Sequence, residues 1–181
     1  MFRRFRNPGQ NATPLSPAQL QMMNQANQLV ASGQPIVAAP LFAQLASGME
    51  ASNHPRRAAN LHAQAAHAFA DGNDEQDALA QARGALSLFI QYKMIQRTPV
   101  FFANITRKFT KKSMKNAAEA LLKEFGPVVG GMPAPAPAAA PRGSLPTSCP
   151  KCGAPLHGSE ANWIDANTAE CDYCGTSIRA T

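Results

Sequence analysis

The sequence predicts a mainly α-helical protein, in which a three-hairpin helical-repeat solenoid precedes a small C-terminal module with β structure. Three observations support this fold class. Prolines and glycines divide the first two thirds of the chain into helix-length segments. Apolar positions in those segments recur forty residues apart. All four cysteines of the chain fall near its C-terminal end, in two copies of Cys-x-x-Cys-Gly.

Capping residues and helix breakers predict the helix boundaries. Ser16 precedes Pro17, and Gln19 can complete a capping box, so a helix should begin at residue 17. Gly33 separates this helix from the next one. Gly72 marks a later break, and the acidic residues after it suit a helix N-terminus. We expect six helices, at about 17–32, 35–50, 55–71, 74–93, 98–112 and 114–125.

Small and apolar residues recur at equivalent positions in the helical region. The recurring sets are Ala38, Ala78 and Ala118; Leu29, Phe69 and Phe109; Ala26, Ala66 and Thr106; and Phe42, Ala82 and Leu122. This period predicts three stacked helical hairpins that share one elongated core. The segments NQANQLVASGQPIVAAPLFAQLA and HAQAAHAFADGNDEQDALAQARGAL resemble tetratricopeptide-like helical repeats, over roughly residues 17–126. In stacks of this kind the first helix of each hairpin lines a concave groove.

A proline-rich segment separates the helices from the cysteines. Residues 127–148 hold six prolines among 22 residues, several alternating with alanine, a composition that favours extended polyproline II and excludes a helix interior. We therefore divide the chain into four parts. These are a flexible basic N-terminus (1–14), a helical-repeat domain (15–126), a Pro/Ala-rich linker (127–148) and a cysteine module (149–181).

The cysteine spacing predicts a structural metal site. The pattern is Cys149-x2-Cys152-x18-Cys171-x2-Cys174, and the glycine after each pair permits a tight turn. Four thiolates that close a tetrahedron suit Zn²⁺ and leave no coordination position for a substrate. So short a module buries too little apolar surface to fold alone, so metal binding must supply its folding free energy. We expect one structural Zn²⁺, bound by these four cysteines.

The module resembles a zinc ribbon, a short β-hairpin fold, over its whole length. We expect Trp163 and Ile164 to form the strand between the cysteine pairs, with Tyr173 and Ile178 close to the metal. Two other interpretations use the same cysteines: a redox-active Cys-x-x-Cys pair and a rubredoxin-like iron site. A redox-active pair is usually found in a βαβ unit, which this sequence does not predict, and no electron-carrier partner is evident for an iron site. We therefore favour zinc.

Polar residues on the first helix of each hairpin form a candidate binding groove. Positions i, i+4 and i+7 share a helix face, and the forty-residue period extends the set from one hairpin to the next. The candidate groove residues are Asn24, Asn27, Asn60, Gln64, His67, Asn104, Arg107 and Lys111. Amides can bind the backbone of an extended peptide, and Arg107 with Lys111 could hold a carboxylate. Ordinary polar surface has a similar composition.

Charge is distributed unevenly along the chain. Residues 1–131 carry fourteen Lys or Arg against seven Asp or Glu, whereas residues 149–181 carry two against four. Lys108, Lys112 and Lys115 lie in the most basic stretch and could bind an anionic partner, although such a run is often only a solvated helix face. The same division of charge suggests that the acidic cysteine module docks on the basic third hairpin and masks it.

These observations favour a non-enzymatic adaptor or scaffold that mediates protein–protein interaction. The alternative is a nucleic-acid-associated protein that uses the basic third hairpin. The sequence contains no nucleophile elbow, phosphate loop or carboxylate pair in a recognisable setting. We expect no membrane span and a cytoplasmic location, since no apolar run is long enough to cross a bilayer and no apolar stretch follows the basic start of the chain.

Overall fold

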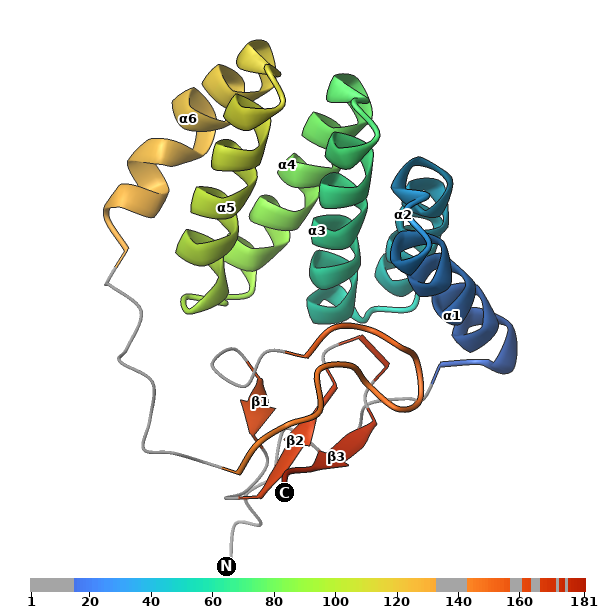
Figure 1. Cartoon of the computed structure of the whole chain (residues 1–181). Coiled ribbons are helices and arrows are strands. Elements are labelled where there is room, and N and C mark those ends of the chain that lie inside the picture. Colours follow the sequence, from blue (N-terminus) through green and yellow to red (C-terminus); the bar gives the residue numbers. More distant parts are fainter. Residues whose placement is uncertain (1–14, 133–142, 157–160, 164–166, 172, 175) are drawn as a thin grey trace, which may run out of the picture.

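The computed structural model describes residues 15–132, 143–156, 161–163, 167–171, 173–174 and 176–181. Within these ranges the chain forms six helices followed by a small antiparallel sheet (Figure 1). The helices are α1 (Pro17–Ala31), α2 (Pro35–Ala51), α3 (Pro55–Asp71), α4 (Glu75–Gln91), α5 (Arg97–Lys111) and α6 (Lys115–Gly130). The prediction of a mainly helical protein is therefore confirmed.

The predicted N-terminal signal of α1 is present in full. The hydroxyl of Ser16 accepts a hydrogen bond from the backbone N–H of Gln19 at 3.2 Å, and the Gln19 side chain accepts one from the backbone N–H of Ser16 at 2.9 Å. The end of α6 differs from the prediction, because the helix continues through Pro127 to Gly130. Proline keeps a helical φ and here removes one hydrogen bond near the helix end, while Val129 packs against the core.

The corners between helices share one backbone conformation and one spacing. A residue with positive φ follows the end of each of the first five helices: Gly33, Asn53, Asn73, Lys93 and Ser113. In every corner the next residue donates its N–H to a carbonyl in the preceding helix, as Asp74 does to Phe69 at 2.9 Å. This is the left-handed C-terminal cap of the Schellman type. The corners are twenty residues apart, so the forty-residue sequence period corresponds to two helix-and-corner units.

Each helix packs against its neighbours in the chain, and α3 also contacts α5 while α4 contacts α6. Large side chains such as Phe42, Phe89 and Phe109 are almost fully buried between them. Many of the other core positions are alanines, which allow close approach of the helices. Leu122 is an exception to its predicted apolar set, because it lies on the last helix and is 53% exposed.

The C-terminal module contains three short strands: β1 (Asn162–Trp163), β2 (Thr168–Glu170) and β3 (Ser177–Arg179). They form one antiparallel sheet in the order β1-β2-β3, with Ala169 opposite Ile178. Trp163 lies in β1 as predicted, whereas Ile164 falls outside the described residues. Ser144 and Thr181 exchange backbone hydrogen bonds of 2.8 and 3.0 Å, so ordered structure begins before the first cysteine.

None of the helices in the described part of the chain is both long and apolar enough to cross a membrane.

Candidate metal centre and adjoining cavity

The two cysteine pairs meet at one point in the C-terminal module. The sulfur atoms of Cys149, Cys152, Cys171 and Cys174 all lie within 4.8 Å of one another, and all four residues are buried. The Sγ atoms of Cys149 and Cys174 are 3.6 Å apart, and those of Cys152 and Cys171 are 3.8 Å apart. Four soft donors in this arrangement could hold a metal ion.

Tight turns bring each pair of sulfurs to this point. In the first turn the N–H of Gly153 donates to the carbonyl of Cys149, and the N–H of Cys149 donates to the carbonyl of Ala154, both at 2.8 Å. Gly153 has a φ of +72°, a conformation that favours glycine. In the second turn the N–H of Cys171 donates to the carbonyl of Thr176 at 2.8 Å. The tight turn predicted from the first glycine is therefore present.

Mutual hydrogen bonding shifts the pKa values of the thiols in opposite directions. Hydrogen bonds from Cys152 and Cys171 lower the pKa of Cys174, and Thr176 adds to this effect. Hydrogen bonds to Cys171 and Cys174, together with burial, raise the pKa of Cys152. The bond with Cys152 favours ionisation of Cys171, but the bond with Cys174 and burial prevail and raise the pKa of Cys171 to about 12. A metal cation that binds these sulfurs would displace the protons of the thiols.

The cysteine module rests against the helices through its first turn. The side-chain amide of Asn27 on α1 donates a hydrogen bond of 2.7 Å to the backbone carbonyl of Cys152. A Cβ on Gly153 would lie 3.5 Å from the Cβ of Asn27, so this turn and α1 are in van der Waals contact. A predicted groove residue thus binds the backbone carbonyl of one metal-ligand candidate.

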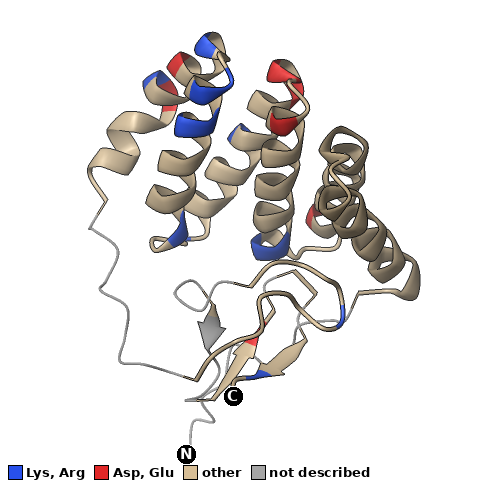
Figure 2. Cartoon of the chain, in the orientation of Figure 1, with Lys and Arg blue, Asp and Glu red and all other residues tan. Residues whose placement is uncertain are grey.

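The module lies against the helices, as predicted, but it does not cover the lysines of the basic third hairpin. The contact of Asn27 places the module on α1, whereas the lysines at the α5–α6 corner lie at the far end of those helices (Figure 2). Two of those lysines already have a partner within the helices. Lys108 forms an ion pair of 2.7 Å with Asp71, and Lys112 donates to the Asp71 backbone carbonyl at 3.1 Å. Lys115 is exposed at the start of α6.

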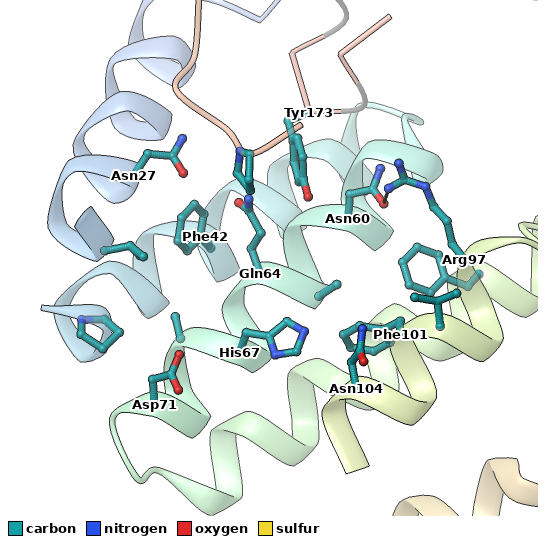
Figure 3. A pocket seen from close by; sticks show the side chains of 17 residues that line it. Asn27, Phe42, Asn60, Gln64, His67, Asp71, Arg97, Phe101, Asn104 and Tyr173 are labelled. Atoms are coloured by element: carbon teal, nitrogen blue, oxygen red, sulfur yellow. Dashed lines mark hydrogen bonds between the residues drawn. The ribbon is translucent and has the colours of Figure 1, made fainter. Parts of the chain in front are cut away.

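A cavity of about 320 Å³ lies where the module meets α1, α3 and α5 (Figure 3). Five of the predicted groove residues line it: Asn27, Asn60, Gln64, His67 and Asn104. Asn24 lies beside Gly153 instead, and Arg107 and Lys111 are exposed and do not line the cavity. The helical spacing and the forty-residue period thus predicted three of the residues that α3 contributes to this wall, but only Asn104 among those that α5 contributes.

Other residues of the cavity wall were not predicted. Arg97 lines it and donates a hydrogen bond of 2.7 Å to the Asn60 side chain. Pro155 and Tyr173 reach it from the cysteine module. Arg97 lies at the start of α5, outside the polar stripe that the sequence defined, and no spacing rule relates the module to the helices across the linker.

Two polar atoms on the cavity wall have no hydrogen-bond partner among the described residues: Oε1 of Gln64 and Nδ1 of His67, both buried. Burial lowers the pKa of His67 to about 4, with a further contribution from the positive charge of Lys108, while Asp71 acts in the opposite direction. The imidazole is therefore neutral at pH 7. Its ring meets the ring of Phe101 edge to face, with centroids 5.5 Å apart.

Comparison of the chain with models of known protein families, with curated proteins and with solved structures found no match.

Proposed function

We propose that this chain is a non-enzymatic adaptor that binds a segment of a partner protein in a groove along α1, α3 and α5, with its four cysteines holding one structural zinc ion. The observation that carries the proposal is the convergence of Asn60, Gln64 and Asn104 on one cavity beside the cysteine module. Amide side chains are suited to bind a peptide backbone, because an amide carries both a donor and an acceptor. Gln64 and Asn104 would make these contacts, since the side-chain oxygen of Asn60 already accepts from Arg97.

The geometry of the sulfurs supports zinc. A regular tetrahedron with zinc–sulfur bonds of about 2.3 Å places its sulfurs about 3.8 Å apart. The separations of 3.6 and 3.8 Å agree with that value. Four thiolates complete the coordination of the ion, so the metal would stabilise the module rather than activate a substrate. A zinc ribbon, in a reducing compartment such as the cytosol, is the finer assignment that we propose on this basis.

Selection from a random peptide display library tests the adaptor role. Peptides retained by the full chain should share a sequence pattern and should lose binding to Asn104→Arg, because Asn104 is exposed at the cavity rim and a long charged side chain there would obstruct entry. Asn116→Arg, on the exposed surface of α6, is the matched control and should retain them. Selected peptides that bind both variants equally, or a library with no enriched sequence, would contradict the proposal.

The second candidate function is nucleic-acid binding by α5 and α6. The observation that favours it is the exposure of Arg107, Lys111 and Lys115 on these helices. The pairing of Lys108 and Lys112 with Asp71 reduces the number of cations available to phosphates. Affinity for single-stranded RNA that falls steeply with rising salt would favour this candidate, whereas peptide binding should depend much less on salt.

A further inference from the structure

The cavity has the size of a pocket for one chemical group rather than for a length of chain. Its volume of about 320 Å³ is near the lower end of the range of roughly 300–1,000 Å³ seen for ligand pockets. Residues from each of the helices α1 to α5 form one part of its wall. The other part comes from Pro155 and Tyr173, each close in sequence to one cysteine pair. The site is therefore composite, and it is complete only when the module is folded and docked.

Four aromatic residues belong to the cavity lining, although Phe42 and Phe89 are almost fully buried in the core behind it. Phe42, Phe89 and Phe101 line it, with Tyr173 on the side of the module. Phe101 is in edge-to-face contact with His67, and its centroid lies 5.6 Å from that of Phe89 in a second edge-to-face pair. Walls of this kind favour a flat apolar group, because aromatic surfaces bury a large area against one another in offset or edge-to-face geometry.

The wall also includes two polar side-chain atoms that lack a hydrogen-bond partner in the described part of the chain. Gln64 and His67 are three residues apart on α3, so they lie on one face of the helix, and Figure 3 shows both side chains directed toward the cavity. Oε1 of Gln64 and Nδ1 of His67 are buried without a hydrogen-bond partner among the described residues. An unpaired buried acceptor is unfavourable, and a ligand that supplies an N–H would remove that cost.

The charged side chains on the wall do not call for a charged ligand. Arg97 donates to Asn60, and Asp71 is paired with Lys108. His67 is neutral, because burial lowers its pKa to about 4. An anion would have to compete for Arg97, and a cation would have to compete for Asp71, so an uncharged group is favoured.

We propose that the cavity binds the indole of a tryptophan in the partner protein, with the indole N–H donating to the unpaired atoms of Gln64 and His67. Indole combines a flat apolar body with a single N–H donor, which matches this wall. A nucleobase is also flat and uncharged, but it carries several further polar atoms, each of which would need its own hydrogen-bond partner in the cavity. The inference rests on the adaptor function proposed above and specifies the group that anchors the partner.

Model compounds test this inference on the full chain as purified. We would titrate ¹⁵N-labelled protein with N-acetyl-tryptophanamide, its 1-methylindole analogue, N-acetyl-phenylalaninamide and adenosine, and follow amide resonances of α3 and α5. The tryptophan compound should bind at the cavity about five- to twentyfold more tightly than the 1-methyl analogue, which has the same shape but no N–H. Gln64→Leu should remove most of this difference. Gln76→Leu, at an exposed position on α4, should leave it unchanged.

Three results would overturn the inference: equal binding of the tryptophan compound and its 1-methyl analogue, no resonance shift with the tryptophan compound, or adenosine as the tightest ligand of the cavity. Comparison with the peptide selection separates this inference from the adaptor role. Selected peptides that bind without a tryptophan would refute the indole pocket and leave the adaptor standing. Indole binding by a chain that selects no peptide would refute the adaptor and leave a small-molecule pocket.

Discussion

The helical region and the cysteine module are stabilised in contrasting ways. The helices bury large side chains from every hairpin, including Met23, Phe89 and Leu121, and their corners repeat one cap. In the module the buried apolar residues other than its cysteines are small or few, chiefly Ala154, Ala169 and Ile178 within the described ranges. Stability in the first region is therefore a sum of many modest contributions, whereas in the second, under the zinc assignment proposed above, it would depend on a single centre.

Removing one cysteine should separate the two regions most sharply. We predict that Cys171→Ser abolishes zinc binding and unfolds the module while the helices stay folded, because structural zinc contributes on the order of 10 kcal/mol to modules of this size. Elemental analysis should find one zinc per wild-type chain and none in the variant. Amide resonances of β2 and β3 should collapse toward random-coil positions in the variant while those of α4 persist. Retention of a dispersed spectrum for the strands would contradict this prediction, and iron in place of zinc would refute the metal assignment.

Lowering the pH should weaken the helical region through His67. Its pKa is about 4 in the folded chain against about 6.5 when unfolded, so below pH 6.5 the unfolded chain binds more protons and stability falls as pH falls toward 4. Between pH 7 and pH 5 we expect a loss of about 2 kcal/mol from this residue.

The free energy of unfolding of wild type and of His67→Gln, measured with denaturant at pH 7 and pH 5, tests this contribution. Subtracting the pH-dependent loss of the variant from that of the wild type removes the effects of all other titrating groups. The variant should lose less stability than the wild type over this pH range. Equal losses in the two proteins would show that His67 is not protected from protonation.

Breaking the contact between the regions should have a smaller effect. Asn27→Ala removes the hydrogen bond to the carbonyl of Cys152, a contribution of about 1 kcal/mol, and should raise the undocked population about fivefold. Faster exchange of the Gly153 backbone amide hydrogen in the variant than in the wild type would show this increase in the undocked population. Asn24→Ala is the matched control, because Asn24 faces the same glycine without a hydrogen bond to it. Faster exchange in the control to the same extent would contradict the assigned role of Asn27.

The smallest expected change tests the corners. Ser113 has a φ of 62°, a conformation that costs a residue with a side chain about 1–2 kcal/mol. Glycine avoids this cost, but it loses more conformational entropy on folding, which offsets part of the gain. Ser113→Gly should therefore stabilise the helices by about 0.5–1 kcal/mol in thermal unfolding. Gly33→Ala should destabilise the helices by about 1 kcal/mol, because alanine is strained at the φ of 77° found there. No steric clash adds to this cost, since a Cβ would meet nothing within 4 Å. An unchanged melting temperature in both variants would exclude a conformational role for these positions.

The contrast between the regions also explains what the sequence could predict. Helix positions follow from capping residues and a regular period, so residue spacing alone was enough to assign Gln64, His67 and Asn104 to one polar face. The contact between Asn27 and Cys152 joins residues 125 positions apart across a linker, and no periodicity carries over such a break. Net charge was a poor guide to docking, because Asp71 had already engaged Lys108 and Lys112.

The twenty-residue interval between corners limits how this chain can tolerate insertions. An insertion of one helix and its corner would reverse the direction of every later helix and exchange the two sides of the array. Asn104 and Phe101 would then leave the wall that they share with His67. An insertion of two units before α5 would restore the direction but place another helix beside α3. Additional helices before α1 would leave the order and direction of α1 to α5 unchanged, so length variation that preserves the helical part of the cavity is expected there.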